Sequence, residues 1–285
     1  VDPEYALGYA GLANTYSLMS LYGLRPPTEV QPLAREAARR ALEIDDSLAE
    51  AYAGLAAVQW SYDWDWDAAE QSYKRALSAN PNYASGHQWY GELLASRGRL
   101  DESIAELRMA MELDPLSVQI RGVLGSYLLL AGREQEGVDQ LQQTVELEPR
   151  ALYALWVLST YHLVRGDTEV GADYLRRTLE IDEAPIIVPL LAFQHVAQGR
   201  PDQARKVLEK LDEISKDRWV SRYNYAAVYV ALGDTDAAFE NFRMAVEERS
   251  DMLVYLETDM TLGSIRDDPR YDEILDAVGL VRWAD

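Results

Sequence analysis

Three aspartates that alternate along the chain could begin a calcium-binding loop. Asp63, Asp65 and Asp67 have the spacing of the first carboxylates in an EF-hand. The loop does not continue, because its sixth position would be Ala68 instead of glycine and its twelfth would be Lys74 instead of glutamate. We therefore expect the aspartates to cap the following helix and the two tryptophans between them to pack in the turn.

Two histidines could also contribute to a metal site. His162 and His195 are separated by one period of a repeated pattern and occupy equivalent positions in it, which would bring them near one another in space. Zinc sites need three or four ligands, and no third ligand is evident in the sequence. We expect both histidines to pack between helices, and we predict no metal site and no cofactor.

The other residue patterns that support catalysis are missing from the sequence. The chain has no cysteine, which excludes disulfides, thiolate nucleophiles and thiolate metal sites. No nucleophile and base pair, glycine-rich phosphate loop or pair of catalytic carboxylates can be placed in it. We therefore predict no catalytic residue and expect a protein that is not an enzyme.

Glycines and prolines recur with a nearly constant period of about 34 residues, a length typical of helical repeats. The glycines with this spacing are Gly98, Gly132, Gly166, Gly199 and Gly233. The prolines with the same spacing are Pro81, Pro115 and Pro149. An apolar segment of about 14 residues precedes each glycine turn, and a second of about 13 precedes each proline turn, which is typical of helices. Each unit is predicted to be a helical hairpin.

This pattern resembles the tetratricopeptide repeat, which reads W-x2-L-G-x2-Y, then A-x3-F, then P. The third unit matches it at Tyr90, Gly91, Leu94, Gly98, Leu107, Ala110 and Pro115. The last unit matches it at Tyr225, Ala226, Tyr229, Gly233, Ala238, Phe242 and Ala245. The resemblance implies an all-α fold, a right-handed α-α superhelix of about seven helix pairs with a C-terminal capping helix.

The period predicts where the solenoid begins and ends. We expect it over residues 1–250, in units of approximately 4–48, 49–83, 84–117, 118–151, 152–184, 185–218 and 219–250. Residues 251–285 are predicted to cap the last unit, with Asp268 as N-cap and Pro269 opening the helix. Val1-Asp2-Pro3 resembles the close of a repeat, so we expect an uncapped N-terminal end and a longer protein.

Four short stretches resemble something narrower than the general repeat. They are Tyr22-Gly-Leu-Arg-Pro-Pro27, Tyr62-Asp-Trp-Asp-Trp66, Leu253-Val-Tyr-Leu256 and Asp267-Asp-Pro-Arg-Tyr271. They are similar to the C-terminal repeat region of bacterial multidomain signalling proteins. In that family the repeats follow a winged-helix transcriptional regulator domain, a serine/threonine kinase domain or an adenylate cyclase domain.

In tetratricopeptide proteins the first helix of each pair lines a concave groove. The offsets from the glycines therefore predict a partner-binding groove of Asn14, Trp60, Gln88, Leu129, Tyr153, Trp156, Phe193 and Tyr223. Its aromatic residues are of the kind that anchors interfaces, although each could instead pack against a neighbouring repeat. Because the groove is mostly apolar or neutral, we expect no clamp for a peptide carboxylate and favour an apolar or basic segment as partner.

Composition limits the partners further. The 48 acidic and 27 basic residues give a net charge of −21, which repels nucleic acids and anionic membranes. No stretch has the roughly 18 apolar residues of a membrane span, and the chain shows no leader, so we expect a cytoplasmic protein.

The leading prediction of function is a non-enzymatic module that binds a protein or peptide. We expect it to be the C-terminal part of a larger bacterial signalling or regulatory protein. The alternative is a ligand-sensing domain that controls an attached DNA-binding or catalytic domain. Self-association through the uncapped N-terminal end is a third possibility.

Overall fold

The computed structural model describes residues 3–283, and every regular element in that range is a helix. Val1 and Asp2, two of the three residues of the N-terminal pattern noted above, lie outside the described residues. Each odd-numbered helix up to α13 packs on the helix that follows it. The pairs are α1 (Ala6–Leu21) with α2 (Pro27–Ile44), α3 (Ala49–Val58) with α4 (Trp66–Ala79), α5 (Ala84–Ser96) with α6 (Leu100–Leu113), α7 (Val118–Leu130) with α8 (Glu134–Leu147), α9 (Leu152–Arg165) with α10 (Thr168–Leu179), α11 (Leu190–Ala197) with α12 (Pro201–Ile214), and α13 (Arg222–Leu232) with α14 (Thr235–Glu247). The predicted all-α solenoid is confirmed.

Four shorter elements depart from this alternation. They are the π-helical η1 (Gln59–Asp63), the 3-10 helices η2 (Asp251–Tyr255) and η3 (Met260–Ile265), and α15 (Pro269–Ala277). The backbone N–H of Arg270 donates to the Asp268 side chain at 3.0 Å, so Asp268 is the N-cap of α15 and Pro269 its first residue. The helix packs against α14.

The periodic glycines end the first helix of a pair. Gly98, Gly132, Gly166, Gly199 and Gly233 have φ angles of 76°, 72°, 86°, 69° and 73°. A residue without Cβ adopts this left-handed conformation at little cost, and it lets the chain leave the helix sharply. The period seen in the sequence is therefore a backbone requirement of the hairpin turn.

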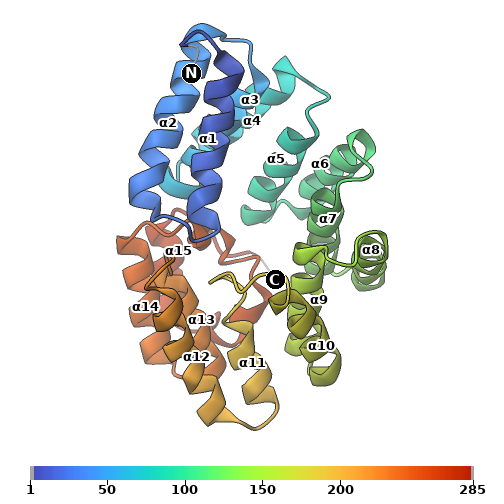
Figure 1. The fold of residues 1–285 in the computed structure, drawn as a ribbon, viewed down its shortest axis with the longest axis vertical. Helices are drawn as coiled ribbons and strands as arrows, with labels where there is room; N and C mark the ends of the chain where they lie inside the picture. The colour runs from blue at the N-terminus through green and yellow to red at the C-terminus, as the bar shows by residue number, and fades with distance from the viewer. Residues whose placement is uncertain (1–2, 284–285) are drawn as a thin grey trace.

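The helix pairs curve into a ring (Figure 1). The odd-numbered helices lie on its inner side and the even-numbered helices on its outer side. Each odd-numbered helix also contacts the next odd-numbered one, from α1 with α3 through α11 with α13. The first helices of the pairs therefore form one continuous inner wall, the concave face of the solenoid.

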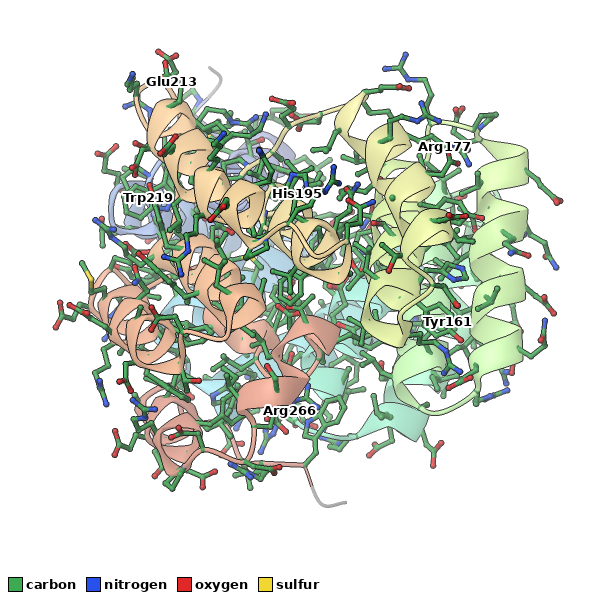
Figure 2. The ribbon with its side chains drawn as sticks, turned by 90° about the horizontal axis from the view of Figure 1, so that it is seen from below. Tyr161, Arg177, His195, Glu213, Trp219 and Arg266 are labelled. Atoms are coloured by element: carbon green, nitrogen blue, oxygen red, sulfur yellow. The ribbon has the colours of Figure 1, made fainter. Side chains whose placement is uncertain are left out.

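The two ends of the helix array meet. The backbone N–H of Trp219, in the turn between α12 and α13 (Figure 2), donates to the carbonyl oxygen of Gly23 at 2.8 Å. Arg218 Nη2 donates to the carbonyl oxygen of Tyr22, also at 2.8 Å. The turn that joins α1 to α2 is thus hydrogen-bonded to the turn before the last pair, and the ring is closed.

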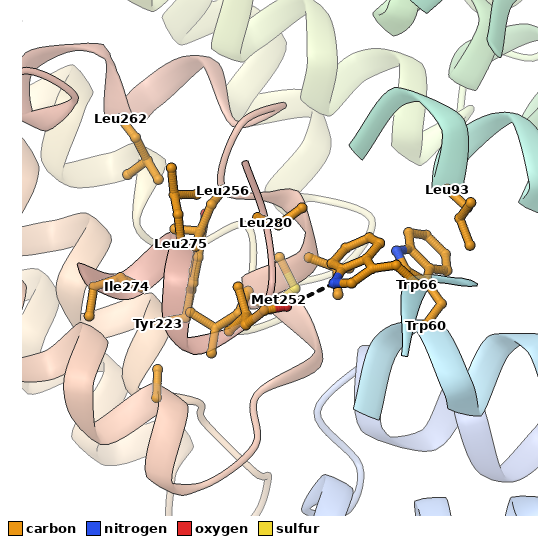
Figure 3. Close-up of a cluster of buried hydrophobic side chains, with 14 of the residues drawn as sticks. Trp60, Trp66, Leu93, Tyr223, Met252, Leu256, Leu262, Ile274, Leu275 and Leu280 are labelled. Atoms are coloured by element: carbon orange, nitrogen blue, oxygen red, sulfur yellow. Dashed lines mark hydrogen bonds between the residues drawn. The ribbon is translucent and has the colours of Figure 1, made fainter. Parts of the chain in front are cut away.

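The main hydrophobic core also joins distant parts of the chain. It combines buried side chains of α3 to α5, among them Trp60 and Leu93, with those of α13 to α15, among them Tyr223 and Leu275 (Figure 3). The indole Nε1 of Trp66 donates to the carbonyl oxygen of Val278 at 2.8 Å. Apolar burial therefore stabilises the closed ring as well as the contacts between adjacent repeats.

The aspartate and tryptophan stretch has a structural role at this junction. The Asp65 side chain accepts a hydrogen bond from the backbone N–H of Ala68 at 3.1 Å and caps α4, as predicted. The indole of Trp64 lies under the Arg249 guanidinium, with its ring centroid 4.8 Å from Cζ. These residues pack the turn and also fix the C-terminal segment.

Candidate functional site

The segment after α14 covers the concave face of the later helix pairs. η3 packs against α9 and α13. The Tyr223 hydroxyl donates to Asp259 Oδ2 at 2.8 Å, and Met260 packs on the cluster that contains Leu129 and Tyr153. In this half of the ring, the inner wall is therefore in contact with the chain's own C-terminal segment.

The eight residues predicted to form the groove do not line one open surface. Four are buried, namely Trp60, Gln88, Leu129 and Tyr223. Four are half-buried, namely Asn14, Tyr153, Trp156 and Phe193. Because η3 packs against α9 and α13 and the Tyr255 ring of η2 meets that of Trp60, several of these side chains already have partners in their own chain.

The predicted residues of the later pairs contact one another. The rings of Tyr153 and Trp156 meet edge to face, with centroids 5.6 Å apart. Trp156 and Phe193 pack against the cluster that includes Leu163 and Leu190. This part of the predicted groove is largely occupied by packing between repeats.

The concave face is hollowed at the first three helix pairs. A cavity of about 250 Å³ lies there, between the inner helices α1, α3 and α5 and the 3-10 helix η2. Its polar and aromatic lining consists of Asn14, Trp60, Tyr83, Trp89, Asp251 and Tyr255, with serines, leucines and alanines between them. Two predicted groove residues, Asn14 and Trp60, therefore line the same cavity.

One carboxylate lies among these aromatic side chains. Asp251 is 5% exposed and is the only charged residue in the described lining of the cavity. Burial raises the pKa of Asp251 to about 6, and hydrogen bonds from Ser20 and from backbone N–H groups offset part of this effect. The group is therefore mostly ionised at neutral pH, although it is buried.

A second buried carboxylate, that of Glu92, is hydrogen-bonded to the cavity residue Tyr255. Gln88 Nε2 donates to Glu92 Oε1 at 3.0 Å, and the Tyr255 hydroxyl donates to Glu92 Oε2 at 3.4 Å. Burial raises the pKa of Glu92 to about 7, and these two hydrogen bonds lower it again in part. Gln88, which was predicted as a groove residue, thus holds the buried Glu92 carboxylate by a hydrogen bond. The Tyr255 ring also meets that of Trp60 edge to face, with centroids 5.6 Å apart.

A larger cavity, of about 600 Å³, lies between α10 and α11. Its charged residues are already paired at the surface. Arg176 bonds Asp173 and Glu180 at 2.7 and 2.6 Å, and Lys210 bonds Glu183 at 2.9 Å. In exposed pairs of this kind each charge is neutralised by its partner, and the pair is weak. This cavity therefore has fewer unpaired charged groups to recognise a ligand than the cavity at Asp251.

The two histidines predicted to lie near one another do not form a metal site with a third ligand among the described residues. His162 stacks on Tyr174 with ring centroids 5.9 Å apart, and its Nδ1 is 3.2 Å from Asp167 Oδ2. His195 lies on α11 and Tyr161, the neighbour of His162, on α9 (Figure 2). Burial and the nearby Arg200 lower the pKa of His195. Across residues 3–283, no group of three or more histidine, aspartate or glutamate side chains is placed to hold a metal ion.

The fold can be placed among known proteins. Residues 65–118 and 195–248 each match a model of the tetratricopeptide repeat. The fold and both segments support the tetratricopeptide repeat (TPR) family. No curated protein matches the chain.

Solved structures share this TPR architecture. A TPR protein from Parabacteroides merdae is 12% identical, with a TM-score of 0.55 over 95% of this chain and 98% of that one. PilW, a widely conserved type IV pilus biogenesis factor, is 20% identical, with a TM-score of 0.55 over 70% and 92%. Pseudomonas aeruginosa pilF is 20% identical, with a TM-score of 0.51 over 73% and 93%. At these identities the likeness concerns the fold.

Several residues of the cavity were not predicted from the TPR offsets. Tyr83 precedes Gln88 by five residues and Trp89 follows it directly. Asp251 and Tyr255 come from the segment expected only to cap the last repeat. The apolar stretch Leu253-Val-Tyr-Leu256 within an acidic segment was the available signal that it is buried.

Within the described range, none of the helices is both long enough and apolar enough to cross a membrane.

Proposed function

We propose that this chain binds a protein or peptide through the open part of its concave face, between α1, α3 and α5. TPR repeats are interaction modules, typically without catalytic activity. The observation that supports this site is the cavity of about 250 Å³, which combines four aromatic side chains with polar groups. Large aromatic surfaces with few polar groups are typical of the anchoring points of interfaces.

The charge of the surroundings favours an apolar or basic segment as the partner. The chain has a net charge of −21, and no lysine or arginine is among the described residues lining the cavity. Acidic surroundings attract and orient a positively charged partner. A clamp for a terminal carboxylate, which needs cationic side chains, does not suit this cavity.

Selection of peptides from a random displayed library by the full chain tests this proposal. Selected peptides should be rich in apolar and basic residues. We expect Trp89→Ala to weaken their binding at least about tenfold, the size typical of an interface anchor. Trp156→Ala is the matched control, because that tryptophan is also half-buried but lies outside the cavity. Loss of binding in the control alone would contradict the site.

We further propose that the module serves a bacterial signalling or regulatory protein in the cytoplasm. The supporting feature is the similarity of Tyr22-Gly-Leu-Arg-Pro-Pro27 and Asp267-Asp-Pro-Arg-Tyr271 to the C-terminal repeat region of such proteins. The coding sequence upstream of Val1 tests this proposal. A winged-helix, kinase or cyclase domain is the expected finding, and an unrelated domain would contradict it.

A second proposed interaction is self-association through the first helix pair. Among residues 3–283, seven of the fifteen exposed large apolar side chains lie between Tyr5 and Leu33. Such a concentration is typical of a surface that meets another protein. Light scattering at increasing concentration should show a dimer that Leu7→Glu weakens, whereas a constant monomer mass would contradict this proposal.

A further inference from the structure

The cavity between α1, α3, α5 and η2 has an unusual combination of chemistry. Four aromatic side chains, Trp60, Tyr83, Trp89 and Tyr255, surround a single carboxylate, that of Asp251. Aromatic side chains around a carboxylate suit organic cations, because the ring faces are negative and the carboxylate supplies the counter-charge. Neutral or anionic ligands would gain little from Asp251.

Asp251 lacks a full set of partners. Its side chain is 5% exposed, and its Oδ2 atom is buried without a hydrogen-bond partner. A buried carboxylate oxygen without a donor is costly, and structures usually supply a donor or a cation. Since burial raises the pKa of Asp251 only to about 6, the group is mostly charged at neutral pH and can attract a cation.

Arg249, which precedes Asp251 by two residues in the sequence, and Arg35 are engaged elsewhere. Arg249 Nη1 donates to the carbonyl oxygen of Tyr62 at 2.9 Å, and its guanidinium lies over the rings of Tyr62 and Trp64. Arg35 forms an ion pair with Asp63. Neither arginine therefore neutralises Asp251, and a cation from outside the chain can supply the donor that its Oδ2 atom lacks.

The size and walls of the cavity suggest which cation fits. At about 250 Å³ it is below the roughly 300 to 1,000 Å³ of pockets for drug-sized ligands. Leu18, Leu21 and Ala57 provide apolar contacts beside the aromatic rings. A long aliphatic stem that ends in a positive charge can bury its methylene groups against such a wall.

We propose that this cavity binds the alkylammonium or guanidinium group of a lysine or arginine side chain, with Asp251 as the counter-charge. The proposal rests on the proposed function, because the side chain would belong to the peptide on the concave face. A free amine has the same charged group, so the test must compare the two sources.

Titration of the full chain with small probes tests this inference. The probes are N-acetyl-lysine methylamide, N-acetyl-arginine methylamide, butylammonium and the neutral N-acetyl-norleucine methylamide, followed by indole N–H signals in NMR. We expect saturable shifts of the Trp60 and Trp89 signals with the cations, at least tenfold tighter than with norleucine. Asp251→Asn should weaken the cations at least tenfold and leave norleucine unchanged.

A second variant tests the proposal while leaving Asp251 in place, so that its result does not depend on how the Asp251 substitution affects folding. Leu18→Lys places a competing ammonium on the rim of the cavity and should also weaken the cations about tenfold. Leu33→Lys is the matched control, because it adds the same charge at an exposed position of α2 outside the cavity. Equal weakening by both variants would overturn a local role for Asp251.

The outcomes separate this inference from the proposed function. If selected peptides bind but tolerate norleucine in place of every lysine and arginine, the cation site is wrong and peptide binding stands. If butylammonium binds and depends on Asp251 while no peptide binds, the cation site stands and the proposed function is wrong. Binding of none of the probes overturns the inference.

Discussion

The two halves of the concave face use equivalent helix positions differently. At α9 and α13 the inner wall is covered by η3, with Tyr223 bonded to Asp259 and Leu129 close to Met260. At α1, α3 and α5 the inner wall remains hollowed, and Asn14 and Trp60 line a cavity. A repeat offset therefore identifies inward-facing residues, whereas the path of the C-terminal segment determines which of them a partner can reach.

The same segment contributes to both halves. η3 fills the half formed by the later pairs, and η2 places Asp251 and Tyr255 at the edge of the open half. The C-terminal segment thus takes part both in closing the ring and in lining the cavity. Changes in this segment should affect stability through the filled half and binding through the open half.

Truncation of a core residue in this segment should have the largest effect. Leu256 is fully buried in the main cluster, so Leu256→Ala should lower the free energy of unfolding by about 2 to 5 kcal/mol. Leu18→Ala, at the open cavity and 36% exposed, should cost less than about 1 kcal/mol. Urea unfolding measures both, and equal costs would remove the distinction between the halves.

The carboxylate of Glu92 should make stability depend on pH. Because burial raises its pKa to about 7, the unfolded chain loses this proton near its ordinary pKa of 4.5 while the folded chain retains it. The contribution of Glu92 to stability therefore falls as the pH rises from about 4.5 to 7. It stays low at higher pH.

Replacement of this carboxyl by an amide isolates its contribution. The stability of Glu92→Gln relative to the native protein should be about 3 kcal/mol higher at pH 8 than at pH 4. Urea unfolding at both pH values measures the difference. Glu240→Gln is a surface control for loss of one exposed carboxylate, and a native-like pH profile in Glu92→Gln would contradict the burial argument.

A smaller effect is expected from the hydrogen bond that ties the filled half to η3. Tyr223→Phe removes the 2.8 Å bond to Asp259 Oδ2 and should cost about 1 to 2 kcal/mol. Asp259 Oδ1 keeps its bonds to the backbone and hydroxyl of Thr261, so η3 should still form. Selected peptides should bind this variant with native affinity, and weakened binding would show that the filled half also contributes.

Local signals in the sequence predicted the local parts of this structure. The glycine period follows from left-handed helix ends, and the caps at Asp65 and Asp268 follow from side chains that accept backbone N–H bonds. These features depend on residues a few positions apart, so one sequence displays them.

The closing contacts could not be predicted in the same way. Trp66 and the carbonyl of Val278 are 212 residues apart, and Tyr255 and Glu92 are 163 apart. Whether a C-terminal segment covers the last repeat or enters the ring depends on the summed curvature of all repeats, which no local pattern encodes. This is why Asn14 and Trp60 could be assigned to the inner wall while Asp251 and Tyr255 were missed.

The indole N–H signals of the seven tryptophans test the central claim most directly. On addition of a selected peptide, the signals of Trp60 and Trp89 should shift because both side chains line the cavity. The signal of Trp156, on the inner wall outside the cavity, should stay in place and serves as the internal reference. Shifts at Trp156 with none at Trp60 and Trp89 would contradict the claim that the open half binds the partner.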